Sequence, residues 1–303
     1  MRDQADDRAP RAPQDAEPAP PFPRQKLDKP GLEAELEPRP RYAAPDYRPA
    51  GKLIGKVALV TGGDSGIGRS VAVLYAREGA DVAIAALPAE RVDSEETRRA
   101  VESHGRRCLV VEADLGSAQA CRDAVARTVA ELGRLDILVH NAAHQNHWTS
   151  LEEVPDDEWD RTFRVNVYAY FWLVKAALPH LKPGAAIIAS GSQTGIAGSG
   201  PLPAYSSTKG AIHTFTKTLS QMLLDRGIRV NCVAPGPVWT PLNAADRGRS
   251  PKEVSTFGAH APIGRPAQPE EVAPAYVFLA SDGDSRYITG EVINVLGGTT
   301  TAG

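Results

Sequence analysis

Tyr205 and Lys209 combine side-chain types and a spacing that suit proton transfer to an alcohol or carbonyl oxygen. They stand four residues apart at the start of the helical pattern AYSSTKGAIHTFTKTLS, so both project from one helical face. A phenol with an ordinary pKa of about 10 is a poor base at neutral pH, but a nearby ammonium group favours its phenolate form. The pair predicts general acid/base catalysis, with a chance match as the alternative in a chain that has 8 tyrosines.

Two polar residues upstream are candidates for the same site. Ser192 lies 13 residues before Tyr205, after the strand-like run AAIIAS, and its hydroxyl would hold a substrate oxygen there. A serine that only shapes the loop is the alternative. Asn166 lies within RTFRVNVYAYFWLV, where an amide on an apolar helix is costly unless it is hydrogen-bonded. A structural cap or a helix bend is the alternative for Asn166.

The run TGGDSGIG at 61–68 predicts a phosphate site. It follows the apolar run KVALV and precedes a helical pattern. Gly62 would allow a tight turn, Gly66 a close approach of the backbone to a pyrophosphate, and Gly68 close packing of helix and strand. The free N–H groups and the positive dipole end of the helix would then meet the anion. Taken alone, the motif also fits an ordinary strand-to-helix turn.

Apolar runs alternate with helical patterns from Lys52 onward, and this alternation predicts an α/β fold. Runs such as KVALV are typical of strands buried on both faces of a parallel sheet. We therefore expect a Rossmann-like doubly wound parallel sheet, folded as a single domain over residues 51–303, which holds both the cofactor and the substrate site. Strands are expected near 57–61, 81–87, 107–111, 136–140, 185–190, 228–234 and 291–296. Helices are expected near 67–78, 93–103, 117–132, 157–181, 205–226 and 270–281.

Residues 1–50 are predicted to form a proline-rich N-terminal arm. Eleven of the 25 prolines lie there, among charges and few branched apolar residues. Such a segment buries too little apolar surface to offset its ordering entropy, so we expect it to be disordered or extended. We also expect that removal of residues 1–45 leaves the protein folded. Four of its residues are candidates for contact with a neighbouring subunit: Leu32, Leu36, Tyr42 and Tyr47. A passive solubilising tail is the alternative.

The composition disfavours several functional classes. The 303 residues carry a net charge of −3 and a pI of about 6.2, so we expect no general attraction to nucleic acid or to an anionic membrane. No apolar stretch reaches the length of a membrane span, and the N-terminal MRDQADDRAP has no apolar signal segment. The widely spaced Cys108, Cys121 and Cys232 predict buried reduced thiols and a cytoplasmic location. His144 and His147 have no partner at metal-ligand spacing, so we expect no metal site.

Together, these motifs resemble the short-chain dehydrogenase/reductase family in content and order. The resemblance covers roughly residues 51–300 and is most specific in the spacing of Ser192, Tyr205 and Lys209. Within the family, the chain is similar to the bacterial aldehyde-reductase-like branch with a proline-rich N-terminal arm, in GGDSGIG, KAALPHLK, APGPVWTPL and QPEEVAPAYVFLAS. The family motifs stand at TGxxxGIG (61–68), Asp114-Leu115, LDILVHNAA (135–143), Asn166, Ser192, YxxxK (205–209) and RVNCVAPGPVWT (229–240).

The resemblance implies an NAD(P)-dependent oxidoreductase that interconverts an aldehyde or ketone and an alcohol by hydride transfer. Tyr205 would be the general acid/base, and Lys209 would lower its pKa and hold the nicotinamide ribose. Ser192 would orient the carbonyl, and Asn166 would anchor a water in the proton relay. The cofactor contacts that the resemblance implies are Gly62, Asp64, Ser65, Gly66, Ile67, Gly68, Asp114, Leu115, Asn141, Ala142, Tyr205, Lys209, Pro235, Gly236, Val238 and Thr240.

The resemblance also implies a homo-oligomer, with a tetramer as the first expectation and a dimer as the second. Related enzymes pair through long helices, which here correspond to 157–181 and 205–226. The aromatic residues Tyr168, Tyr170, Phe171 and Trp172 would suit this interface. A contact within the chain's own core is the alternative.

Two departures from the family pattern bear on the cofactor. The motif after the fourth strand reads NAA in place of NAG, which is a small change. The common Asp near the end of the second strand is replaced by Ala86, so a 2′-phosphate is not repelled there, while Asp64 adds a negative charge nearby. Arg69 or Arg91 would bind such a phosphate, with solvated helix charges as the alternative. The choice between NAD and NADP therefore stays open.

The substrate, a small carbonyl or alcohol compound, is expected between 143–150, 193–203 and the segment after Thr240, with residues 243–260 as a mobile lid. These walls do not identify the substrate. Two other functions remain open, a catalytically silent nucleotide-binding sensor or scaffold and an epimerase or dehydratase on the same fold. The complete set of four candidate catalytic residues favours the oxidoreductase.

Overall fold

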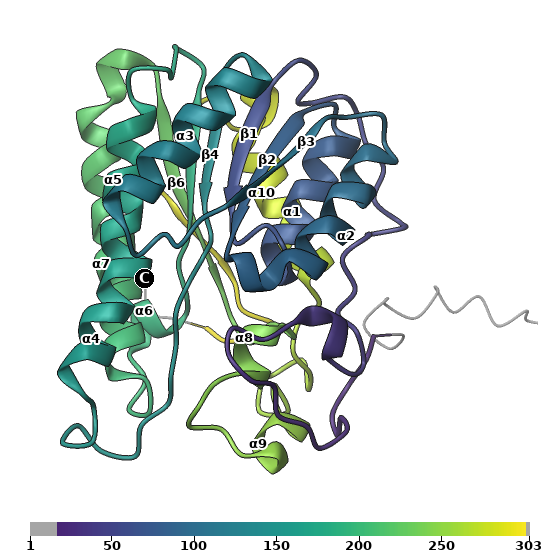
Figure 1. Ribbon diagram of the computed structural model, residues 1–303, viewed down its shortest axis with the longest axis vertical. Helices are drawn as coiled ribbons and strands as arrows, with labels where there is room; N and C mark the ends of the chain where they lie inside the picture. Colours follow the sequence, from purple (N-terminus) through teal and green to yellow (C-terminus); the bar gives the residue numbers. More distant parts are fainter. Residues whose placement is uncertain (1–16, 301–303) are drawn as a thin grey trace, which may run out of the picture.

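The protein is built on one sheet of seven parallel strands, as a computed structural model shows for the described residues 17–300 (Figure 1). The strand order is β3-β2-β1-β4-β5-β6-β7. The order reverses between β1 and β4, and a doubly wound sheet binds its ligands at the carboxyl ends of the strands beside such a reversal. Every strand begins and ends within one residue of its predicted position, which confirms the Rossmann-like fold. The strands are β1 Val57–Thr61, β2 Asp81–Ala86, β3 Cys108–Glu112, β4 Ile137–His140, β5 Ala186–Ser190, β6 Arg229–Pro235 and β7 Val292–Val295.

Helices cover both faces of the sheet, and this explains the continuous apolar runs of its central strands. Every residue of β1 is buried, and its neighbours Leu59 and Val60 enter two different apolar clusters on opposite faces. One face is covered by α1 (Gly66–Arg77), α2 (Arg91–Glu102) and α10 (Pro269–Ala280). The other face is covered by α3 (Ala118–Leu132), α5 (Ala169–Ala177) and α7 (Pro203–Met222).

The helix predicted over 157–181 is interrupted in the structure. Here α4 (Asp156–Phe163) is followed by a π-helical turn at Arg164–Tyr168, and α5 begins after it. Asn166 is the central residue of this turn and is fully buried. The prediction of one continuous helix was wrong, because a local turn of different pitch leaves the apolar pattern unchanged. A bend at Asn166 was the alternative interpretation of that residue.

Short helices that the sequence did not predict surround the carboxyl edge of the sheet. They are α6 (Thr194–Ala197), α8 (Pro241–Ala244) and α9 (Pro251–Ser255). A further short helix, α11 (Asp282–Ser285), lies at the opposite edge, where Asp282 pairs with Arg229 at the start of β6. Both α8 and α9 contribute residues to the region expected to be a mobile lid. Within it, Val254 is buried and the ring of Phe257 lies 6.4 Å from that of Trp239. This region is therefore anchored by apolar contacts.

Residues 17–40 are mostly extended and pack along the carboxyl edge of the sheet next to α8 and α9 (Figure 1), and residues 41–50 continue beside α1. Phe22 and Leu36 are buried, and the ring of Phe22 lies 4.1 Å from that of Trp239. Tyr42 contacts Arg69 and Tyr47 bonds to Glu78, so these residues pack on their own chain. The expectation of contact with a neighbouring subunit was therefore wrong for the fully buried Leu36, whereas it stays a prediction for the half-buried Tyr42 and Tyr47. The rest of the predicted arm, residues 1–16, lies outside the described residues.

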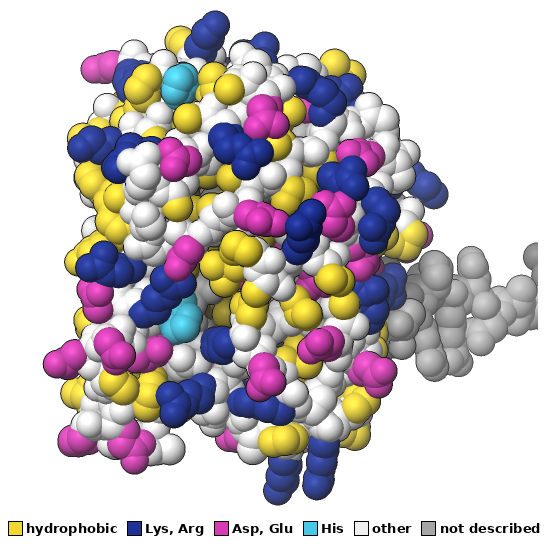
Figure 2. Space-filling model, viewed as in Figure 1, with side chains coloured by type: hydrophobic (Ala, Val, Ile, Leu, Met, Phe, Trp, Pro, Cys, Tyr) yellow, Lys and Arg dark blue, Asp and Glu magenta, His cyan; other side chains and the backbone are white. Residues whose placement is uncertain are grey.

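Three further expectations concern membranes, metals and thiols. No helix between residues 17 and 300 is long and apolar enough to cross a membrane. Within the same residues, no three His, Cys, Asp or Glu side chains gather as a metal site. The cysteines are free, with Cys121 and Cys232 buried and Cys108 only half-buried. Basic and acidic side chains are interspersed over the face shown in Figure 2.

Candidate active site

Ser192, Tyr205 and Lys209 line one cavity of about 250 Å³, which we call the Tyr205 cavity. Ser192 follows β5, and the other two residues lie in the first turns of α7. Ser192 is hydrogen-bonded to the Tyr205 hydroxyl. The Lys209 ammonium lies 5.2 Å from the centre of the tyrosine ring and donates a hydrogen bond of 2.6 Å to the Ser190 carbonyl. The three residues expected to act together therefore share one site.

Burial controls the protonation of this group. It raises the pKa of Tyr205 to about 12, although the hydrogen bond with Ser192 acts in the opposite direction. Burial also lowers the pKa of Lys209 to about 8, with the Cys232 thiol opposing this shift. The expected lowering of the Tyr205 pKa by Lys209 is not seen, because desolvation of the phenol dominates. Tyr205 is therefore a protonated phenol at neutral pH, suited to donate its proton to a carbonyl oxygen.

The position of Ser192 is fixed by its own loop. The backbone nitrogen and the hydroxyl of Thr194 donate hydrogen bonds of 3.1 and 3.0 Å to Ser192 Oγ. The backbone nitrogen of Ser192 donates to His213 Nε2 at 3.3 Å. Burial lowers the pKa of His213 to about 4, so its ring is neutral and accepts this bond. With its oxygen already accepting two bonds, the Ser192 hydroxyl is left to donate toward Tyr205.

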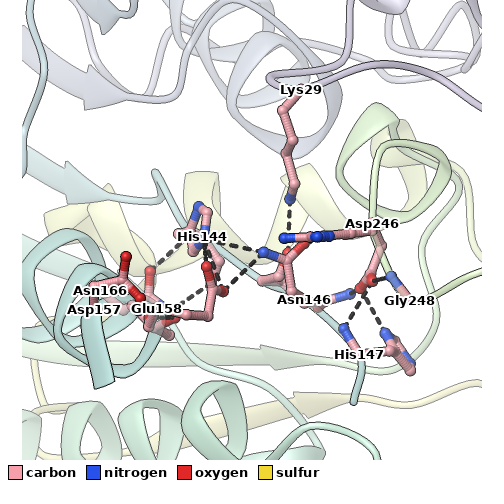
Figure 3. Close-up of polar contacts among 12 residues, drawn as sticks. Lys29, His144, Asn146, His147, Asp157, Glu158, Asn166, Asp246 and Gly248 are labelled. Atoms are coloured by element: carbon pink, nitrogen blue, oxygen red, sulfur yellow. Dashed lines mark hydrogen bonds and ion pairs between the residues drawn. The ribbon is translucent and has the colours of Figure 1, made fainter. Parts of the chain in front are cut away.

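Asn166 connects the segment after β4 to α7, and Figure 3 shows its place beside His144. Its Oδ1 accepts from the His144 backbone nitrogen at 2.7 Å, and its Nδ2 donates to the His144 carbonyl and to Thr208 Oγ1, each at 3.0 Å. Its backbone carbonyl is contacted by Nε2 of the buried His140 at 2.8 Å. The side-chain amide therefore positions the protein chain. The water-anchoring role that the resemblance implied for Asn166 stays a prediction. No sequence pattern indicated the His140 contact.

A second cavity of about 190 Å³, the glycine-turn cavity, lies at the carboxyl ends of the central strands. The predicted cofactor residues that line it are Gly62, Asp64, Ser65, Gly66, Ile67, Asp114, Leu115, Asn141, Ala142 and Thr240. Three further predicted residues line the Tyr205 cavity, namely Pro235, Gly236 and Val238. Ile67, Asn141 and Thr240 line both cavities. The two cavities therefore meet at shared residues. Gly68 alone lines neither cavity.

The glycines of the turn have the geometry that a dinucleotide needs. Gly66 has φ +50°, and a Cβ added there would lie 2.9 Å from Thr240 Cγ2. A Cβ added at Gly62 would lie 3.0 Å from the Ala142 Cα. At Gly68 it would lie 1.9 Å from the Gly62 carbonyl oxygen, so Gly68 serves the packing of α1. Side chains at the first two positions would fill the cradle between β1 and the opposite wall.

Asn141 and Asp114 hold parts of this cavity in place. Asn141 Nδ2 donates to the Thr61 and Gly62 carbonyls at 3.1 Å, which ties the glycine turn to β4. Asp114 forms an ion pair of 3.0 Å with Arg161. Burial would raise the pKa of Asp114, but Arg161 outweighs it and lowers the pKa. Both residues therefore have structural contacts in addition to the cofactor contacts expected of them.

The end of β2 carries carboxylates instead of a phosphate-binding cation. Glu90, which sequence reasoning missed, lines the glycine-turn cavity beside Asp64 and Ala86. Its Oε2 accepts from the Leu87 backbone nitrogen at 2.8 Å. Burial, assisted by the charge of Asp64, raises the pKa of Glu90 to about 8. The only sequence signal was an acidic residue four positions after Ala86.

Neither candidate arginine lines this cavity. Arg69 is fully buried and forms ion pairs with Glu33 at 2.6 Å, Glu96 at 3.1 Å and Asp93 at 3.5 Å. The hypothesis that Arg69 binds a 2′-phosphate was therefore wrong, because its charge is already neutralised inside the protein. Arg91 is exposed and lies 3.9 Å from Glu112.

The N-terminal arm also reaches the glycine-turn cavity, which no sequence pattern predicted. Lys29, Pro30 and Gly31 form part of its wall. Lys29 Nζ donates to the Gln145 carbonyl at 2.7 Å (Figure 3). Glu33 Oε2 accepts from the Gly66 backbone nitrogen at 2.6 Å. The arm is therefore part of the candidate site.

The doubly wound sheet, the glycine turn and the group of Ser192, Tyr205 and Lys209 define a short-chain dehydrogenase/reductase. Residues 62–300 match the family model described as enoyl-(acyl carrier protein) reductase. The chain belongs to the short-chain dehydrogenase/reductase family, as its motifs predicted.

Comparisons with individual proteins agree with this family. The chain is 50% identical over 271 residues to general stress protein 39 of Bacillus subtilis (strain 168), covering 89% of this chain and 93% of that protein. It is 42% identical over 275 residues to the chloroplastic NADPH-dependent aldehyde reductase 1 of Arabidopsis thaliana, covering 89% of this chain and 95% of that protein. The crystal structure of a short chain dehydrogenase from Burkholderia cenocepacia J2315 in complex with NADP has a TM-score of 0.75 and 33% identity, covering 82% of this chain and 98% of that one. These likenesses confirm the fold and the similarity to aldehyde reductases.

Proposed function

We propose that this protein is an NAD(P)-dependent oxidoreductase that interconverts an aldehyde or ketone and the corresponding alcohol. The observation that carries the proposal is the hydrogen bond between Ser192 and Tyr205, beside Lys209, in a cavity that meets the glycine-turn cavity. The similar aldehyde reductase and the NADP complex of a related dehydrogenase support the reaction class.

The chain's own residues provide the proton chemistry. A bound nicotinamide cofactor supplies the hydride that reduces the carbonyl carbon and accepts it in the reverse direction. Ser192 donates a hydrogen bond to the carbonyl oxygen and orients it toward Tyr205. The Tyr205 hydroxyl gives its proton to this oxygen, so that one hydride and one proton convert C=O into CH–OH. The Lys209 ammonium stabilises the phenolate that remains.

The dinucleotide would lie against the glycine turn. Gly62 and Gly66 would admit its pyrophosphate, and the positive end of α1 favours the negative charge. Asp114 and Leu115 would contact the adenine, and Lys209 would hold the nicotinamide ribose as well as act on Tyr205. The choice of these residues rests on the family resemblance and on their places in the two cavities.

We also propose that the protein forms a homo-oligomer in the cytoplasm, a tetramer in the first instance. Tyr168 and Phe171 are 42% and 46% exposed, which makes them candidates for an interface at α5. Tyr170 belongs to the chain's own core, where its ring stacks on His140 at 5.0 Å. It is therefore not available as an interface residue.

The experiment that tests the proposal has two steps on the full chain. NADH and NADPH are titrated separately by energy transfer from tryptophan, and each is then mixed with a panel of aldehydes and ketones. We expect binding of at least one cofactor and its oxidation by at least one carbonyl compound. Binding without oxidation of either cofactor would favour the nucleotide-binding sensor or scaffold. Binding with isomerised or dehydrated products would favour the epimerase or dehydratase.

A further inference from the structure

The wall of the Tyr205 cavity carries positive charge without any carboxylate. Among the described residues, its ionisable side chains are His147, Tyr205, Lys209 and Arg249. The glycine-turn cavity differs, because Asp64, Glu90 and Asp114 line it. Lys209 already has a role at Tyr205, whereas the proton chemistry leaves Arg249 without one.

Arg249 is held in place by a chain of hydrogen bonds. Its Nη2 lies 3.0 Å from His147 Nε2, and His147 Nδ1 lies 2.5 Å from Asp246 Oδ2 (Figure 3 shows the His147–Asp246 contact). Arginine can only donate, so His147 accepts at Nε2 and donates from Nδ1 to Asp246. Burial would raise the pKa of Asp246, but the bonds from His147 and Gln145 outweigh it and lower the pKa to about 2. The ionised Asp246 therefore fixes the histidine tautomer that orients Arg249.

The loop that carries Arg249 is braced from two further sides. Its guanidinium lies 5.1 Å from the centre of the Phe257 ring, and Phe257 lines the same cavity. Lys26 of the N-terminal arm donates to the Arg249 carbonyl at 2.7 Å and also to the Asp246 carbonyl. A guanidinium held in this way loses little conformational freedom when it binds a ligand.

Two buried polar atoms on the cavity wall have no partner among the described residues. One is Arg249 Nε, a donor, and the other is Gln193 Oε1, an acceptor. Within residues 17–300, no carboxylate lies within ion-pair distance of Arg249, and the charges of Asp246 and Glu253 act on it from further away. Buried polar groups without partners are costly, and at a binding site a ligand can satisfy them.

We propose that the substrate carries an anionic substituent, a carboxylate or a phosphate, and that Arg249 binds it. Arginine presents its N–H groups as a planar fork that matches the oxygens of either anion. Gln193 Oε1 would accept a hydrogen bond from a hydroxyl of the same substrate. Asp246 and His147 are positioning residues that act through Arg249. This inference rests on the proposed carbonyl reduction and adds a substrate class to it.

The test compares pairs of aldehydes with and without an anionic group, using the full chain and its preferred cofactor. One pair is 4-oxobutanoate and butanal, and the other is glyceraldehyde 3-phosphate and glyceraldehyde. In the wild type, we expect the anionic member of at least one pair to have a kcat/KM about 10- to 100-fold higher, mainly through a lower KM. The pair with the larger ratio distinguishes carboxylate from phosphate.

Arg249→Gln should reduce this ratio by about tenfold or more, and Arg249→Lys should reduce it less. Arg247→Gln is the matched control, because Arg247 is exposed on the same loop and outside the cavity wall. A wild-type ratio near one in both pairs, or an equal loss for both members in Arg249→Gln, would overturn the inference while leaving carbonyl reduction intact. If the protein reduces none of these four compounds and none of the wider panel, this result would instead count against the proposed function.

Discussion

The carboxylate of Glu33 accepts a hydrogen bond from the backbone nitrogen of Gly66 at a distance of 2.6 Å. This contact joins the proline-rich arm to the first residue of α1, inside the glycine turn. The other oxygen of Glu33 lies 2.6 Å from Arg69, and both side chains are fully buried. Asp93 binds the arm in return by accepting from the Glu33 and Ala34 backbone nitrogens at 2.6 and 3.1 Å. The arm and the turn therefore form one folded unit.

Replacement of Glu33 by Ala should destabilise this unit. It leaves the Gly66 N–H without its buried acceptor, which costs about 1–3 kcal/mol. Glu33→Gln keeps an amide oxygen for that N–H and should cost less. The free energies of unfolding are measured by denaturant titration, with the exposed Glu35→Ala on the same turn as the control. Equal values for Glu33→Ala and Glu35→Ala would show that the contact contributes nothing.

Leu36 gives a test of the arm that does not involve charge. Its side chain is 0% exposed, so Leu36→Ala should lower the free energy of unfolding by about 2–5 kcal/mol. Leu151→Ala, at a leucine that is 68% exposed, should change it by no more than about 0.5 kcal/mol. The expectation that removal of residues 1–45 leaves a stable protein is accordingly replaced, and such a truncation should be strongly destabilised. A truncated chain as stable as the full one would contradict the packing of residues 17–45.

Glu90 should influence the choice between the two cofactors. A carboxylate at the end of β2 accepts hydrogen bonds from ribose hydroxyls and repels a 2′-phosphate. Above pH 8, where Glu90 is mostly ionised, Glu90→Gln should therefore strengthen the binding of NADPH relative to that of NADH by about 3- to 10-fold in the ratio of dissociation constants, because one charge is removed. The ratio is measured by fluorescence titration. Exposed Glu95→Gln on α2 is the control, and an identical ratio in both variants would remove Glu90 from cofactor selection.

The same residue predicts a pH dependence. Because the pKa of Glu90 is raised to about 8, its side chain is mostly protonated below that pH and negatively charged above it. Discrimination against NADPH should consequently increase as the pH rises through 8, and this increase should disappear in Glu90→Gln. If the ratio of the NADPH and NADH dissociation constants of the wild type is constant from pH 6 to pH 9, this result would contradict the role of Glu90 in cofactor selection.

Lys209 predicts that carbonyl reduction slows at high pH. Burial lowers its pKa to about 8, so the ammonium that stabilises the Tyr205 phenolate is lost above that pH. The rate with saturating cofactor should fall as the pH rises through 8. In Lys209→Arg the cation persists, so the fall should move to higher pH even if the rate is reduced overall. An unshifted profile in Lys209→Arg would assign the fall to another group.

The elements and the grouping of Ser192, Tyr205 and Lys209 were predictable because their signals are local. The run KVALV shows β1 through its continuous apolar residues, and the glycine turn follows directly. Tyr205 and Lys209 lie on one helix, and Ser192 follows the strand β5, so topology alone brings them together.

The contacts that complete the site escaped prediction because they join distant irregular segments. Glu33 and Gly66 belong to an extended arm and a turn, and neither has a periodicity that specifies the partner. His147 and Arg249 are more than one hundred residues apart, on two loops. Asn166, in the π-helical turn, accepts a hydrogen bond from the His144 backbone nitrogen, and this contact becomes visible only once β4 and its following segment are placed.

The central claim is that Tyr205 transfers the proton in carbonyl reduction, and Tyr205→Phe tests it most directly. We measure the cofactor dissociation constant and the turnover number on the same preparation, with Tyr287→Phe at a fully exposed tyrosine as the control. We predict that Tyr205→Phe binds cofactor within a few-fold of the wild type and loses about 10²- to 10⁴-fold in turnover. Turnover within a few-fold of the wild type would contradict the assignment of Tyr205 as the general acid.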